Sequence, residues 1–384
     1  MDDGLAQTAN SSSGIYVTDA GTLRDLCAKL AGHKCIAVDT EFSRTRSYYP
    51  IMSLIQVAAT GIAFAVDLLK LSRQELQPLF DILQNPKCCK VFHSGRQDIE
   101  GLYSAFSVVV ANAFDTQVAM QFSGAHGQPG YEAMVRHYLN IQVAKDMQFS
   151  DWMQRPLRQE QLDYAIADVV HLLDVYPMVL SEIVQAGKLA WLQQECDGMI
   201  NAAISPASCY DILRKLGLAS IDEQLIARAY RLVQWREQYA VSLNLNRIFV
   251  MPDAMLGLLA RKPALFPKNN TQYNKLGGRN KVPGESLRQL VQTPPELLLE
   301  ATTEELTIAR DVIADNRRMV KTPLFTMLKE LLGTTAAEHK ISEPFIASQL
   351  DLLRFASKQR TKLDHGWRHE VFGRQASSLR DASL

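Results

Sequence analysis

The order of the apolar segments constrains this chain more than any other feature. Up to about residue 140, short apolar runs of strand length alternate with segments of helical spacing, whereas almost no strand pattern is present after residue 204. The predicted strands span residues 35–38, 54–58, 63–67, 90–92 and 108–114, and the predicted helices span 76–83, 98–103, 116–122, 131–139 and 158–185. Strands interleaved with helices predict an α/β domain with a mixed central sheet.

The second half of the chain shows helical patterns, many of them bounded by proline or glycine. These helices are predicted at residues 225–243, 253–260, 283–292, 303–319, 322–332 and 343–357. A chain of 384 residues exceeds one ordinary domain. The predicted organisation is a mobile N-terminus (1–14), an α/β domain (15–203), two helical domains (204–293 and 294–376) and a tail (377–384).

Composition excludes several classes of protein. Residues 1–14 are polar, with acids at Asp2 and Asp3, so we expect no secretory leader. The apolar stretch 51–69 is interrupted by a Thr60-Gly61 turn and polar residues, so no membrane span is predicted. The six cysteines include no C-x-x-C pair, which predicts reduced thiols, no zinc site and a cytoplasmic location. No self-association element is evident, so we expect a monomer.

The formal net charge of zero conceals an asymmetry. Residues 1–201 carry a charge of about −7 and the remainder about +7. An acidic half joined to a basic half suits a metal-binding domain next to one that binds a polyanion, although solvated surfaces can also differ by chance.

The first candidate motif is Asp39-Thr40-Glu41, directly after an apolar run. Residues two apart on a strand project to the same face, so the two carboxylates should converge at the end of a buried strand. Carboxylates that point together repel each other unless a cation lies between them. The alternative for an isolated D-x-E pattern is a strand end with acids in solvent.

Two further motifs add acids. Asp98 follows the segment His93 to Gly95 and opens a predicted helix, where it is either a ligand or a helix cap. Tyr164 and Asp168 are four residues apart on a predicted helix and share one face, a spacing that ordinary amphipathic helices also show. Asp115, followed by Thr116, is interpreted as a helix cap, and His93 is not assigned to metal.

The three motifs together, in this order, resemble the DEDD exonuclease superfamily, in the subgroup with tyrosine in its third motif. The surrounding sequence is similar to the ribonuclease D family over residues 34–180, in these segments: 39–50, 54–56, 115–117, 130–131, 150–152 and 155–157. Beyond it, residues 234–237, 246–247, 251–253 and 258–260 resemble the helical HRDC domain that this family shares with RecQ-type helicases, and 366–373 resemble the family's C-terminal end. The proline expected before Arg247 is absent, which puts in doubt which HRDC residues touch RNA.

This resemblance implies a ribonuclease H-like exonuclease domain followed by two small HRDC-like domains. It also implies a metal-dependent 3′→5′ exoribonuclease that releases nucleoside 5′-monophosphates and trims structured RNA such as tRNA precursors. Asp39, Glu41, Asp98 and Asp168 would hold two divalent cations, Mg²⁺ or Mn²⁺. Tyr164 would orient the attacking water.

Basic and aromatic side chains outside these motifs are candidate RNA contacts, with packing or solvated surface as the alternative. They are Arg44, Arg46, Tyr48, Tyr49, Lys145, Arg155, Arg236, Arg247, Lys275 and Arg279. Two rival functions share these motifs: a DNA 3′→5′ exonuclease, and an RNA-binding scaffold on a nuclease fold without activity.

Overall fold

A computed structural model of the chain describes residues 14–124, 128–143, 147–205, 208–218, 222–265, 271, 303–317 and 322–382. The chain forms two compact units. Unit 1 comprises Met1–Ser43 and Pro50–Ile204, and unit 2 comprises Arg44–Tyr49 and Ser205–Leu384. The predicted mobile N-terminus lies almost entirely outside the described residues. Of the helices that the structure describes, none combines the length and apolarity needed to cross a membrane.

Unit 1 contains one six-stranded sheet in the order β1-β4-β3-β2-β5-β6. Its strands are β1 (Ile15–Val17), β2 (Cys35–Ser43), β3 (Ile51–Ala59), β4 (Ile62–Asp67), β5 (Cys89–Phe92) and β6 (Ala113–Asp115). β3 is antiparallel to β2 and to β4, whereas the other neighbours are parallel. The predicted mixed sheet is therefore confirmed.

Two strand predictions differ from the structure. β2 continues past the apolar run to Ser43 because it pairs antiparallel with β3 as far as Ser43 opposite Ile51, so Asp39 and Glu41 lie within the strand rather than at its end. The strand predicted at 108–114 is reduced to Ala113–Asp115, the three residues that pair with β5.

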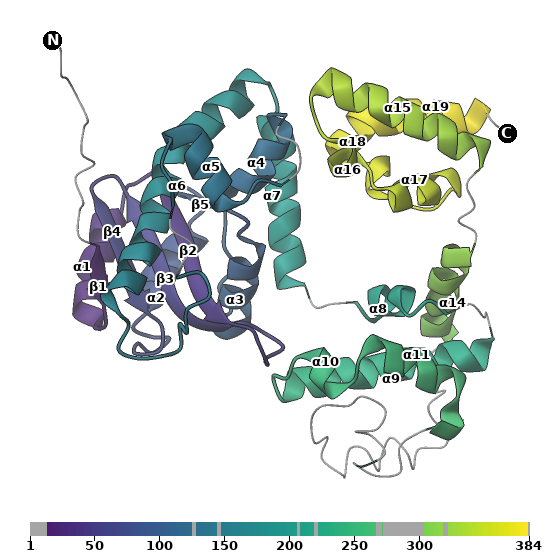
Figure 1. Cartoon of the computed structure of the whole chain (residues 1–384), viewed down its shortest axis with the longest axis horizontal. Helices are drawn as coiled ribbons and strands as arrows, with labels where there is room; N and C mark the ends of the chain where they lie inside the picture. The colour runs from purple at the N-terminus through teal and green to yellow at the C-terminus, as the bar shows by residue number, and fades with distance from the viewer. Residues whose placement is uncertain are drawn as a thin grey trace. The chain divides into compact units, whose positions relative to one another are not determined.

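Helices cover the sheet of unit 1 on both faces (Figure 1). The main core, under one face, joins side chains of β2 such as Ile36 and Val38 to α1 (Ala20–Leu30), α2 (Gln77–Gln84), α3 (Arg96–Phe106) and α7 (Leu189–Ile204). The patterns above did not predict α1 and α7. α6 (Gln159–Gln185) packs across β2, β3 and β4 and also contacts α4 (Thr116–Phe122) and α5 (Tyr131–Leu139). Because side chains alternate along a strand, Asp39 and Glu41 project to the face opposite Ile36 and Val38.

In the described residues of unit 2, all regular secondary structure is helical. Its first helices are α8 (Cys209–Lys215), α9 (Glu223–Ser242), α10 (Arg247–Val250), α11 (Asp253–Arg261), η1 (Pro263–Leu265) and α14 (Thr303–Arg317). The later ones are α15 (Pro323–His339), α16 (Glu343–Ile346), α17 (Gln349–Ala356), η3 (Lys362–Asp364), α18 (Gly366–Arg368), η4 (His369–Gly373) and α19 (Arg374–Ala382).

Two details of unit 2 bear on the predicted domains. α14 packs on α8 and α9 and adds Ala309 and Ile313 to their apolar core, although the predicted boundary at residue 294 assigns it to the second helical domain. That boundary and the helix predicted at 283–292 lie outside the described residues. The single helix predicted at 343–357 is two helices, because the backbone at Ala347 is extended and Ser348 caps α17.

Candidate active site

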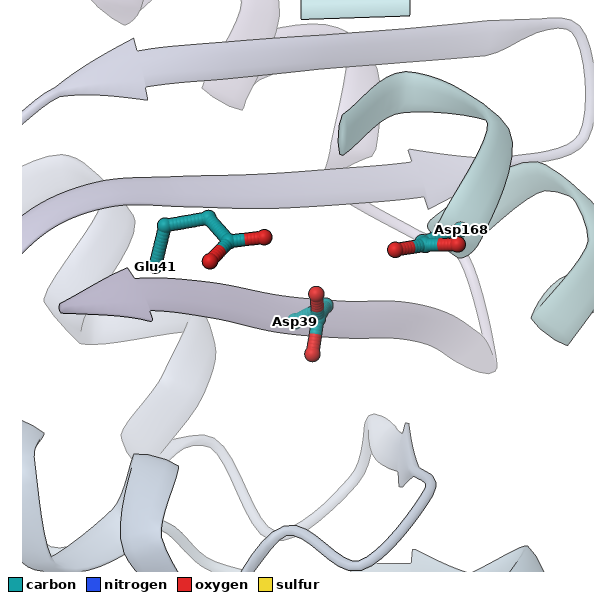
Figure 2. Close-up of side chains that lie close together, drawn as sticks. All are labelled: Asp39, Glu41 and Asp168. Carbon is teal, nitrogen blue, oxygen red and sulfur yellow. The ribbon is translucent and has the colours of Figure 1, made fainter. Parts of the chain in front are cut away.

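Three carboxylates converge between β2 and α6. β2 supplies Asp39 and Glu41, and α6 supplies Asp168 (Figure 2). One oxygen of each carboxylate lies within 4.8 Å of one oxygen of each of the others. The predicted convergence of the first and third motifs is therefore observed, since β2 places its two acids on the face that α6 covers.

Asp98 approaches from a third element. It lies in the first turn of α3, is 7% exposed, and accepts a hydrogen bond from the Thr40 hydroxyl on β2. Its carboxylate does not belong to the group of three described above. Thr40 thus connects the strand that carries two of the acids to the helix that carries Asp98.

Burial and mutual repulsion raise the pKa values of these acids. The pKa of Asp39 is well above its usual range because of burial and the nearby charges of Asp98 and Asp168. Burial, followed by repulsion from Asp39, raises the pKa of Glu41 to about 10. Burial also raises the pKa of Asp98 to about 6 and that of Asp168 to about 7. Hydrogen bonds within the protein, such as that from Thr40 to Asp98, therefore offset only part of the cost of a charged carboxylate at these positions.

The donor set fits a hard divalent cation. Within the described residues, no lysine or arginine forms an ion pair with Asp39, Glu41, Asp98 or Asp168. Oδ1 of Asp168 is buried without a hydrogen-bond partner, a state that is costly unless a ligand occupies it. Carboxylate oxygens are the ligands that Mg²⁺ and Mn²⁺ prefer, whereas zinc sites usually include nitrogen or sulfur ligands.

Tyr164 stands one helical turn before Asp168 and is half-buried. Its ring centroid lies 6.2 Å from that of the buried Trp152. Burial, then the charges of Asp168 and Glu41, raise the pKa of the Tyr164 hydroxyl well above its usual value. The phenol is therefore a hydrogen-bond donor at neutral pH rather than a base.

Three residues around the acids lie in segments that resemble the family but were predicted to have no role. These are Thr40, Gln56 and Tyr131. Gln56 pairs directly with Asp39 across β2 and β3, is fully buried, and its amide atoms have no partner among the described residues. The Tyr131 hydroxyl donates a hydrogen bond to the backbone oxygen of Asp168 at 2.5 Å. A glutamine within an otherwise apolar strand was the available signal for Gln56.

Two predicted RNA contacts have partners inside the protein. The Arg155 guanidinium donates to Asp67 at 2.7 and 2.9 Å and to the backbone oxygen of Trp152 at 2.7 Å. Arg236 is fully buried and contacts Glu237 and Asp253, the latter at 2.5 Å. Guanidinium groups held in this way have few donors left for a phosphate.

The segment Arg44–Tyr49 forms hydrogen bonds within unit 2. The Tyr48 hydroxyl donates to Glu237 at 2.9 Å and accepts from Arg247 at 3.2 Å. The Asn246 backbone N–H donates to the Arg46 carbonyl, the Tyr49 N–H donates to Asn244, and Arg44 donates to the Tyr48 carbonyl. The Arg46 side chain is exposed. Lys145, Lys275 and Arg279 lie outside the described residues.

His93 and Asp115 serve the local structure. Nδ1 of His93 lies 2.9 Å from the Thr116 hydroxyl, and burial lowers the His93 pKa. Asp115 caps α4, as predicted, by accepting from the backbone N–H groups of Gln117 and Val118.

Comparisons with known proteins agree with this geometry. A family model described as 3′-5′ exonuclease matches residues 15–183. The ribonuclease D of Zymomonas mobilis is 32% identical over 380 residues, covering 96% of this chain and 94% of that protein. The ribonuclease D of Sphingobium indicum is also 32% identical, with 96% and 95% covered. The crystal structure of Escherichia coli RNase D superposes with a TM-score of 0.77 at 27% identity, covering 96% of this chain and 99% of that one.

Proposed function

The chain belongs to the ribonuclease D family and is a hydrolytic 3′–5′ exoribonuclease, and from this premise we propose that it uses two divalent cations, Mg²⁺ or Mn²⁺, to release nucleoside 5′-monophosphates. The observation that supports this proposal most is the group of three carboxylates whose oxygens lie within 4.8 Å of one another. A partly buried cluster of like charge is unfavourable by itself, and a cation removes the repulsion.

Each acid takes the role that the resemblance to the family implies, and the following contacts support it. The charges of both Asp98 and Asp168 raise the pKa of Asp39, and its carboxylate would be a ligand of both cations. Glu41 and Asp168 would be the other ligands of the first cation. Asp98 would hold the second cation, mainly through coordinated water. When bound, the cations would activate the attacking water and neutralise charge on the leaving oxygen.

Tyr164 would orient the attacking water. Its hydroxyl keeps its proton at neutral pH because its pKa is raised, so it donates a hydrogen bond and does not abstract a proton. The backbone of Asp168 is held by the Tyr131 hydroxyl, which fixes this part of α6 relative to α5.

The substrate would be the 3′ end of structured RNA, such as a tRNA precursor. Escherichia coli RNase D is described as an exoribonuclease involved in structured RNA processing, and this chain matches nearly all of it. Residues 204–376 would form two HRDC-like domains, with α14 in the first of them, and these domains would recruit RNA through basic side chains. Exposed Arg46 remains a proposed RNA contact, as do Lys145, Lys275 and Arg279, which lie outside the described residues.

The test is digestion of a 5′-labelled single-stranded RNA with Mg²⁺, Mn²⁺ or EDTA. We expect a ladder that shortens from the 3′ end, loss of this ladder with EDTA, and 5′-monophosphates in the chromatographed product. Asp39→Asn should abolish hydrolysis while RNA binding survives. Tyr164→Phe should slow turnover roughly 100-fold with unchanged Mn²⁺ binding, whereas Tyr103→Phe, an exposed tyrosine of α3, should behave as wild type.

Activity in EDTA, or near-normal turnover of Asp39→Asn, would refute the two-cation mechanism. RNA binding without hydrolysis under any metal condition would favour the scaffold interpretation. A matched DNA strand in the same assay measures the preference between the two sugars.

A further inference from the structure

One buried carboxylate outside the four acids connects two helix starts. Asp115 is the last residue of β6 and the N-cap of α4, and it is fully buried. Its Oδ1 accepts from the backbone N–H groups of Gln117 at 2.9 Å and Val118 at 3.1 Å. These two bonds are what an ordinary helix cap requires, and a serine or an asparagine could form them.

The same carboxylate also holds the turn between β5 and α3. Oδ1 accepts from the Ser94 N–H at 3.1 Å, and Oδ2 accepts from the Gly95 N–H at 2.8 Å. β6 lies beside β5 with Asp115 opposite Phe92, which places the carboxylate next to this turn.

The turn is tight, and its geometry depends on these bonds. Ser94 has a φ of 63°, in the left-handed region that side chains disfavour. A Cβ at position 95 would lie 2.5 Å from the Cβ of Phe92, so only glycine fits there. Gly95 is also the N-cap of α3 and has no side chain with which to cap it. From the neighbouring strand, Asp115 instead accepts the backbone N–H of this N-cap residue and that of Ser94 before it, and so holds the turn that leads into α3.

Asp98 lies three residues after Gly95, in the first turn of that helix. The Thr40 hydroxyl on β2 holds the Asp98 carboxylate. The turn at residues 94–95 leads into α3 and so fixes the position of the Asp98 backbone. We propose that Asp115 is a positioning residue for Asp98, and through it for the second cation, a role that rests on the proposed two-cation function. Four N–H donors on one buried carboxylate exceed what capping α4 needs, and the two additional bonds both go to the segment that leads to Asp98.

Two substitutions separate the cap from this second role. Asp115→Asn keeps Oδ1 for α4 and Ser94 but presents an N–H group to the Gly95 N–H, so that bond is lost. Asp115→Ser keeps a cap on α4 but has no second oxygen for the turn. We expect the Mn²⁺ affinity of the second site to fall about 10-fold in Asp115→Asn and further in Asp115→Ser, within the range measured for residues that orient metal ligands.

The measurement is Mn²⁺ binding to the full chain without RNA, by isothermal titration calorimetry, together with kinetics and thermal melting. The KM for RNA should stay unchanged, and excess Mn²⁺ should restore most of the lost turnover. Asp19→Ser tests the loss of charge at a helix cap alone, since Asp19 caps α1 through the Thr22 N–H at 2.9 Å. Asp174→Asn removes one negative charge without removing a helix cap. The Asp174 carboxylate is exposed and acts electrostatically on Tyr131, so this variant measures the effect of lost charge by itself. Both controls should bind Mn²⁺ as wild type does.

Wild-type Mn²⁺ affinity in both Asp115 variants, even with a lowered melting temperature, would overturn the positioning role and leave Asp115 as a cap. A wild-type chain that binds no Mn²⁺ would overturn the two-cation function and this role together. An equal loss of affinity in Asp174→Asn would assign the effect to charge and would also overturn the role.

Discussion

The ion pair between Arg155 and Asp67 offers a prediction that separates folding from RNA binding. The Asp67 side chain is fully buried at the end of β4, whereas that of Arg155 is 17% exposed. Two hydrogen bonds, at 2.7 and 2.9 Å, join the guanidinium to both carboxylate oxygens. Arg155 also donates to the Trp152 carbonyl and to Ser53, which connects the segment before α6 to β3.

Arg155→Met should destabilise unit 1 by about 3 kcal/mol. Removing one partner of a buried ion pair costs about 3–5 kcal/mol because the other charge stays buried and unpaired. We expect a loss at the lower end of this range for two reasons. The Tyr16 hydroxyl and the Leu69 N–H, the latter at 3.0 Å, still donate to Asp67, and Arg155 is partly exposed. For a domain of this size the melting temperature should fall by roughly 6–12 °C.

The assay is a double-mutant cycle followed by urea denaturation and thermal melting. Asp67→Leu combined with Arg155→Met replaces the pair with apolar side chains of similar volume and should recover most of the lost stability. The cost of Arg155→Met should also shrink below about pH 4. Burial raises the pKa of Asp67, but hydrogen bonds from Arg155 and Tyr16 outweigh it and lower the pKa overall, so the stabilisation exists above the unfolded-state pKa and is lost as pH falls.

A different result would refute this reasoning. If Arg155→Met kept the wild-type melting temperature and raised the KM for RNA, the guanidinium would serve the substrate, as the sequence suggested. If the double variant were as unstable as the single one, the contacts to Trp152 and Ser53 would carry the stability instead of the ion pair.

Two further predictions concern other charged groups. Because burial raises the pKa of Asp98 to about 6 and of Asp168 to about 7, their contribution to stability is greatest below the unfolded-state value near 4 and is lost as pH rises through 6 and 7. The melting temperature in EDTA should therefore fall between pH 5.5 and pH 8, and saturating Mn²⁺ should reverse this fall; an equal slope with and without Mn²⁺ would contradict it. Tyr48→Phe removes the hydroxyl between Glu237 and Arg247 and should cost unit 2 about 1–2 kcal/mol in urea denaturation, with RNA affinity unchanged. Unchanged stability with weaker RNA binding would instead support the predicted RNA contact.

The sequence predicted the acids of the site because their positions depend on local periodicity. Asp39 and Glu41 are two residues apart on a strand, and Tyr164 and Asp168 are four apart on a helix, so each pair shares a face whatever the tertiary structure. The order of the motifs then identified the family, and with it the third element that supplies Asp98.

The partners of the basic residues depend on tertiary structure and had no such signal. Arg155 pairs with Asp67, which lies 88 positions earlier in the chain, and Tyr48 bonds Glu237, 189 positions later. A basic or aromatic side chain on a predicted loop looks the same in sequence whether it meets an acid or a phosphate. The extent of β2 was missed for the same reason, because Thr40 to Ser43 are in the strand through pairing with β3 and not through their own apolar pattern.

Two of the acids lie on a strand in the interior of the sheet. β2 has β3 on one side and β5 on the other, and α6 packs across β2, β3 and β4 above Asp39. A cluster of carboxylates on a mobile loop would separate and lose its repulsion, whereas this framework holds the charges together and their pKa values stay high. Because the fold cannot separate these charges, a bound cation would relieve their repulsion. A cation at a concentration 100 times its dissociation constant would stabilise the folded state by about 2.7 kcal/mol. Under the proposed function, substitutions that loosen α3 or α6 should therefore weaken Mn²⁺ binding, measured by calorimetry, before they lower the melting temperature of the domain.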